Sequence, residues 1–148
     1  MACEGCGCTT CWCAACTRAG EIDIMEARGN APGAAGGGRD SVSSALHWGP
    51  RYDANRYSMT TATRPAGVDL SVDWHIYGLV WSPTRIRTYI DVDDAAHTVL
   101  DVDIGSTTFW QRGGFAAGTA NPWAGGTASA PFDTDFFLVL NLAVGGGF

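Results

Sequence analysis

A chain of 148 residues, 46% hydrophobic and 16% charged, is long enough for one globular domain and too apolar for a disordered protein. Its formal net charge of −6 argues against nucleic-acid binding, which depends on basic patches. No apolar run approaches the length of a membrane span, so the sequence indicates neither a nucleic-acid nor a membrane partner.

The N-terminal segment contains all the cysteines of the chain. They are Cys3, Cys6, Cys8, Cys11, Cys13 and Cys16. Thiolates at this spacing suit a metal ion, but neither a histidine nor a longer insert completes an ordinary zinc module. Disulfides at such short separations would be strained. A third interpretation is that residues 1–19 are not native to the domain that follows. No basic start or continuous apolar core marks a signal peptide.

The stretch Glu21–Glu26 carries three carboxylates in six residues. In a strand, Glu21 and Asp23 share one face, and plain alternation would turn Glu26 towards the core. An unpaired charge is costly there. One extra residue, a β-bulge near Ile24 and Met25, would return Glu26 to the carboxylate face and leave Met25 with the apolar side chains.

Carboxyl groups held this close cannot all ionise freely, so one is expected to have a raised pKa while another stays charged. Retaining glycoside hydrolysis requires such a pair, one carboxyl acting as acid and the other as nucleophile. The alternative is a solvated acidic edge strand. It is disfavoured because the segment is otherwise apolar, with no basic residue before Arg28.

A Gly- and Ala-rich stretch over residues 29–40 predicts a flexible loop, and residues 41–50 predict a strand that contains His47 and Trp48. A tryptophan face is a natural platform for a pyranose ring, and a nearby histidine can bond a carboxylate or hydroxyl. Burial tendencies alone favour the simpler interpretation, in which Trp48 is core and His47 is a satisfied strand residue.

Further strands are predicted at residues 56–60, 73–81, 85–92 and 99–104. The second of these should be packed on both sides, and the third should be a half-exposed hairpin partner. Asp101 and Asp103 share one face of the last strand. We interpret them as a solvated face rather than as a second catalytic or calcium site.

Residues 109–131 predict a long loop with Trp110 and Trp123, whose rings would contact a glycan or pin the loop to the core. A strongly apolar strand is predicted at residues 136–140. Asn141 follows it as either a structural hydrogen bonder or a contact near the sugar. Short strands, turns and no convincing helical period predict an all-β sandwich.

The segment from Glu21 to Asn30, EIDIMEARGN, resembles the active-site signature of glycoside hydrolase family 16, in the bulged form typical of laminarinases (endo-β-1,3-glucanases). Further blocks of the chain resemble that family in the same order. They are residues 46–50, 74–81, 86–91 and 131–146.

This resemblance implies a concanavalin A-like β-jelly-roll sandwich, incomplete at both ends. Residues 20–148 would form a partial catalytic domain. Residues 1–19 fall outside the resemblance because the family has a Trp-Pro-x-x-Gly approach where this chain has Cys16–Gly20. The missing tryptophan would line the sugar subsite next to the nucleophile. This favours the interpretation of the cysteine-rich segment as non-native.

By the same resemblance, Glu21 would be the nucleophile, Glu26 the acid/base and Asp23 the residue that tunes their coupled titration. The implied reaction is retaining endo-hydrolysis of β-1,3-glucan or mixed-linkage β-glucan. The residues expected to contact substrate are Arg28, Asn30, His47, Trp48, Trp110 and Asn141. No catalytic metal or other cofactor is required, and a structural calcium ion is left open.

The resemblance implies a β-glucan polysaccharide or oligosaccharide as partner, a monomer and an extracellular location. A glucan-recognition protein that binds without cleaving remains an alternative, because the missing tryptophan would abolish turnover and leave affinity. A transglycosylase shares the first chemical step, so the sequence does not separate it from a hydrolase. An inactive fragment is the fourth interpretation.

Overall fold

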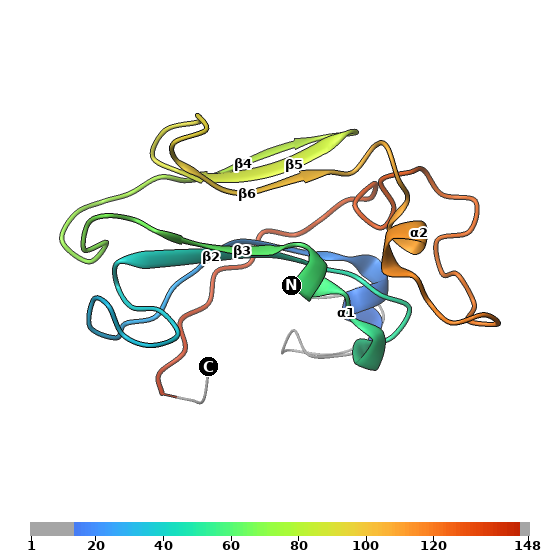
Figure 1. Cartoon of the computed structure of the whole chain (residues 1–148), viewed down its shortest axis with the longest axis horizontal. Coiled ribbons are helices and arrows are strands. Elements are labelled where there is room, and N and C mark those ends of the chain that lie inside the picture. The colour runs from blue at the N-terminus through green and yellow to red at the C-terminus, as the bar shows by residue number, and fades with distance from the viewer. Residues whose placement is uncertain (1–13, 146–148) are drawn as a thin grey trace.

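The computed structural model describes residues 14–145, and within them six strands form two antiparallel sheets that lie one above the other (Figure 1). The first sheet contains β1 (Glu21–Glu26), β2 (Ser41–His47) and β3 (Thr61–Pro65). The second contains β4 (Tyr77–Ser82), β5 (Arg85–Ile90) and β6 (Thr98–Asp103). The shorter elements are α1 (Ala14–Ala19), η1 (Tyr52–Ala54), η2 (Tyr57–Met59) and α2 (Phe109–Gly113). The predicted all-β sandwich is confirmed.

The core lies between the sheets because alternate side chains of their strands point inwards. On β5, Ile86, Thr88 and Ile90 are buried, which confirms the predicted alternation of this strand. The main cluster of buried residues is Leu46, Trp48, Ile86, Leu100, Val102, Ile104, Phe109 and Phe132. A smaller one holds Val42, Ile90 and Val99. The outer face of the first sheet therefore remains available for polar side chains.

The strand predicted at residues 56–60 is wrong, and a second predicted strand begins later than the sequence indicated. Residues 57–59 form a 3-10 turn, and the strand starts only at Thr61. The strand predicted from Asp73 starts at Tyr77, and Trp74 is 96% exposed. The expectation that this segment packs on both sides is wrong, because its first residues lie outside the sheet.

Two short helices accompany the sheets: α1 has six residues, and α2 has five residues at the start of the loop predicted over residues 109–131. Elements this short give too few turns to show a helical period. A capping box begins α2. The side chain of Thr108 accepts from the Gln111 backbone N–H, and the Gln111 side chain accepts from the Thr108 N–H. Gly114 ends the helix with φ 54°.

The prediction of a strand at residues 136–140 is wrong, because this segment has no strand pairing and exposes most of its side chains. Apolar β-branched and aromatic residues favour a strand only where a neighbouring strand accepts their hydrogen bonds. The cysteines from Cys3 to Cys13 lie outside the described residues, so the interpretation of residues 1–19 stays a prediction. No helix within residues 14–145 is long and apolar enough to cross a membrane.

Candidate active site

The carboxylates of β1 share one face because of their register against β2. The pairs are Glu21 with His47, Asp23 with Ala45, and Glu26 with Ser43. Directly opposed residues of antiparallel strands project to the same side, so all three acids lie on the face of the odd-numbered residues of β2. The register shifts between Asp23 and Glu26, which confirms the predicted β-bulge. Met25 is 41% exposed, so the expectation that it lies with the apolar side chains of the core is wrong.

His47 connects β2 to this carboxylate group. Its Nε2 lies 3.0 Å from Oδ2 of Asp23, and both side chains are largely buried. Its ring stacks on Tyr57 at a centroid distance of 4.9 Å and an interplanar angle of 14°. Contact with Asp23 and Tyr57 leaves the imidazole little freedom to turn.

Asn55 fixes the tautomer of His47. The Oδ1 atom of Asn55 accepts the backbone N–H groups of Trp48 at 3.3 Å and Tyr57 at 3.0 Å, so its Nδ2 must face away from them. That Nδ2 donates to Nδ1 of His47 at 2.8 Å. Since Nδ1 is then an acceptor, the proton of neutral His47 is on Nε2 and points at Asp23.

Charge and burial set the ionisation of the site. Burial raises the pKa of Glu26, and the nearby charge of Asp23 raises it further, against smaller opposite effects of His47 and Arg28. Burial lowers the pKa of His47, but Asp23, Glu21 and Glu26 together raise it overall. The hydrogen bond from Asn55 opposes that rise, because a protonated Nδ1 would face an N–H group.

Arg28 and Asn30 lie just after the strand, on the loop that follows β1. A side chain at Gly36 would collide with the Arg28 guanidinium, so Gly36 leaves room for this arginine beside the carboxylates. The Asn30 side chain is exposed, and its backbone oxygen accepts from the Arg39 N–H at 3.0 Å. Their predicted contacts with substrate stay predictions.

The structure places Trp48 in the core instead of on the carboxylate face. Its ring is fully buried, packs edge-on against Phe109 at 4.9 Å, and its Nε1 donates to Oγ1 of Thr60 at 2.8 Å. A ring enclosed on all sides offers no surface to a sugar. The simpler interpretation of Trp48, as a core residue, fits its position.

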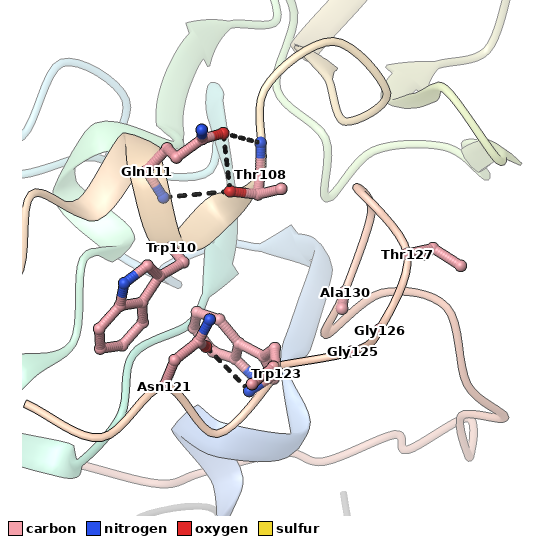
Figure 2. A pocket seen from close by; sticks show the side chains of 10 residues that line it. Thr108, Trp110, Gln111, Asn121, Trp123, Gly125, Gly126, Thr127 and Ala130 are labelled. Carbon is pink, nitrogen blue, oxygen red and sulfur yellow. Dashed lines mark hydrogen bonds between the residues drawn. The ribbon is translucent and has the colours of Figure 1, made fainter.

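No contact among the described residues brings Trp110 or Asn141 to the carboxylates. Trp110 lies on α2 and meets Trp123 at a centroid distance of 6.3 Å and an angle of 77°. Figure 2 shows both indoles with Asn121 beside them. These residues line an open pocket of about 300 Å³ between α2 and the loop up to Ala130. Asn141 is exposed and needs no buried partner. Their contact with a glycan remains a prediction.

Asn55 and Tyr57 support His47, although nothing in the sequence marks them as site residues. Neither lies in a motif with the carboxylates, and only the return of the chain through η1 and η2 brings them there. Within residues 14–145, no group of three or more His, Cys, Asp or Glu residues could hold a metal ion. The structural calcium ion therefore stays a prediction.

A β-sandwich with a protonatable carboxyl and two further acids on an outer face defines a candidate glycosidase site. The family model for glycosyl hydrolases family 16 matches residues 4–133, and the chain belongs to this family. The β-jelly-roll fold implied by the resemblance is thereby confirmed. The match begins inside the cysteine-rich segment.

Similar proteins carry two kinds of name. A β-1,3-glucan-binding protein of Penaeus monodon is 41% identical over 86% of this chain and 33% of that protein. Glucan endo-1,3-β-glucosidase A1 of Niallia circulans is 36% identical over 87% of this chain and 16% of that protein. A glucan endo-1,3-β-glucosidase of Cryptopygus antarcticus is 36% identical over 88% of this chain and 40% of that protein.

The chain thus spans between 16% and 40% of the length of these three relatives. A solved structure from a study titled "Prominent members of the human gut microbiota express endo-acting O-glycanases to initiate mucin breakdown" aligns with a TM-score of 0.45. Its sequence is 27% identical, and the alignment covers 71% of this chain and 31% of that chain.

Proposed function

We propose that this chain carries the catalytic face of an enzyme that cleaves β-1,3-glucan within the polymer, with retention at the anomeric carbon. Glu21 attacks the anomeric carbon, and Glu26 donates a proton to the leaving oxygen. Glu26 then removes a proton from the water that hydrolyses the glycosyl ester. The substrate class rests on the two relatives named as endo-1,3-β-glucosidases.

The observation that supports this proposal is the bulge, which turns Glu26 to the side of Glu21 and Asp23. A general acid must keep its proton near working pH, and the raised pKa of Glu26 serves that need. Asp23 accepts from His47, so one of its oxygens has a fixed partner and the carboxylate is held in place between the two glutamates.

The first test is the substitution Glu21→Gln in the full chain, assayed for new reducing ends on laminarin. Losing the nucleophile should lower kcat/KM by roughly 10⁴-fold or more, while binding of laminarin changes little, because the loss falls on the transition state. Asp101→Asn is the matched control. It makes the same carboxylate-to-amide change on the exposed face of β6, where Asp101 pairs with Arg85.

Cleavage that survives Glu21→Gln would contradict the assignment of the nucleophile. The stereochemical claim has its own measurement, since proton NMR during hydrolysis by the unchanged chain should detect the β-anomer first. An α-anomer as first product would contradict retention.

Recognition without cleavage is the second candidate function, and the relative named a β-1,3-glucan-binding protein favours it. This candidate predicts that the unchanged chain binds laminarin, releases no reducing ends, and binds equally well after Glu21→Gln. The extracellular location expected from the resemblance belongs to either candidate and remains a prediction.

A further inference from the structure

The bulge in β1 has a specific partner in β2. Ile24 and Met25 of β1 stand opposite the single residue Ser44, which is the two-against-one count of a β-bulge. Neither bulge residue has a partner in the pairing register. The Ile24 carbonyl instead accepts a hydrogen bond of 2.7 Å from the Ser44 hydroxyl. A side-chain hydrogen bond thus contacts the backbone where Glu26 is turned outwards.

Ser44 is the middle of a longer chain of hydrogen bonds. Its only hydroxyl proton goes to Ile24, so the 2.8 Å bond between Ser44 and Thr88 must have Thr88 as donor. The Thr88 oxygen in turn accepts from the Leu100 backbone N–H at 3.2 Å. The chain runs from β6 through β5 and β2 to β1, across the whole sandwich.

Both hydroxyls are buried among apolar side chains. Ser44 and Thr88 are each 0% exposed, and neighbouring inward positions such as Leu46 and Ile86 are apolar. Replacing two buried polar partners together by apolar groups is often nearly neutral for stability. Removing one partner alone leaves a buried group unpaired. The particular group that this pair satisfies is the carbonyl of the bulge.

We propose that Ser44 and Thr88 are positioning residues for Glu26, which hold the bulge in the geometry that keeps this carboxyl beside Glu21 and Asp23. Neither residue touches substrate. They act through the backbone of Ile24, two residues before Glu26. The catalytic consequence rests on the proposed function, whereas the structural consequence for Glu26 does not.

Three variants of the full chain test this role. Ser44→Ala removes the hydroxyl at the bulge, and Thr88→Val removes the next hydroxyl while keeping the shape of the side chain. Thr88→Ser keeps the hydroxyl and loses only a methyl group, so it should rescue what Thr88→Val loses. If Ser44→Ala does not fold, the two Thr88 variants decide the question.

Thr60→Val is the control for lost stability. Thr60 is 3% exposed, accepts from the Trp48 indole at 2.8 Å and donates to the Leu46 carbonyl at 3.0 Å. Loss of the Thr60 hydroxyl removes buried hydrogen bonds of the same kind, and these bonds do not involve the bulge. This variant should lower the melting temperature without changing Glu26.

Two readouts separate positioning from folding: the ¹³C NMR titration of the Glu26 carboxyl, and kcat and KM on laminarin. In Ser44→Ala and Thr88→Val the bulge relaxes and Glu26 gains contact with water, so its pKa should fall towards the usual value. We expect kcat to fall roughly 10- to 100-fold, as for a small misplacement of a reacting group. KM should stay within about twofold.

An unchanged Glu26 titration in both Ser44→Ala and Thr88→Val would overturn the proposal, whatever the activity. An equal change in Thr60→Val would also overturn it, because general loosening of the core would then explain the effect. If the unchanged chain does not cleave laminarin, the proposed function fails, and the Glu26 titration alone decides the role of Ser44 and Thr88.

Discussion

Glu26 is a half-buried carboxyl group beside a second carboxylate, and this environment couples its proton to the stability of the fold. Burial and the charge of Asp23 raise its pKa in the folded chain above the usual value of 4.5. The folded state therefore binds more protons than the unfolded state between that value and the raised one. The free energy of unfolding must fall as pH rises through this window.

The substitution Glu26→Gln removes this pH dependence, because an amide is neutral at every pH. The variant should gain in melting temperature relative to the unchanged chain as pH rises from 4.5 through the raised pKa. The difference should be smallest below pH 4.5, where both side chains are uncharged. Thermal unfolding followed by circular dichroism at a series of pH values measures it. A difference that does not vary with pH would contradict the origin of the effect in Glu26.

Individual site residues were predictable from the sequence where the information is local. The bulge near Ile24 followed from the cost of turning Glu26 inwards, and the register confirms it. The burial of Trp48 could also be predicted from its local sequence. It follows Val42, Ser44 and Leu46 at intervals of two, and all of these are buried. Asn55 was not predictable, because its contact with His47 depends on tertiary structure.

At the scale of elements, β1, β5 and β6 lie close to their predicted bounds, whereas β4 begins later than predicted although it is paired correctly with β5. β4 and β5 are joined by a tight turn and pair from Tyr77 with Ile90 to Ser82 with Arg85. β6 pairs with β5 and follows it directly in the chain. The predicted solvated face of β6 is confirmed, because Asp101 and Asp103 are both exposed.

The β4–β5 hairpin contains a glycine that makes room for an aromatic ring. Gly78 is paired with Tyr89, and a Cβ at Gly78 would collide with that ring. Gly78 is not among the glycines with positive φ, so its backbone suits alanine and the collision is the main obstacle. Gly78→Ala should therefore destabilise the fold by about 1–3 kcal/mol through overpacking.

A double-mutant cycle tests this cause. Adding Tyr89→Ala removes the ring, so Gly78→Ala should cost much less in that background, with a coupling of roughly 0.5–3 kcal/mol measured by urea unfolding. Gly67→Ala provides a contrast, because a Cβ at Gly67 would meet no atom within 4 Å, although the backbone there has φ 76°. Additive effects of Gly78→Ala and Tyr89→Ala would show that the ring is not the obstacle.

At the scale of the whole molecule, the sequence predicted the sandwich but not the course of its last segment. A core of two packed sheets follows from alternation within each strand, which is local. Whether residues 136–140 join a sheet depends on which strand edge accepts them, which is not local. Phe136 packs against Trp81 and Phe132, and the chain beyond it leaves the core.

This last segment exposes apolar side chains to an unusual degree. Leu138, Leu140 and Leu142 are 79%, 91% and 93% exposed, and β1 is an edge strand among the described residues. Contiguous apolar surface and an open strand edge both favour association with another chain. We therefore expect copies of the isolated chain to associate at high concentration, in contrast to the monomer expected from the resemblance.

Leu140→Lys and Leu142→Lys should reduce this association, since each places a charge on the exposed apolar surface without removing a core contact. Each also brings the net charge of −6 closer to zero, which on its own would promote association. A reduction would therefore come from the loss of apolar surface. Val72→Lys is the matched control, because Val72 is 80% exposed outside this segment. Sedimentation velocity over a range of concentrations measures the outcome, and an unchanged chain that stays monomeric throughout would contradict the expectation.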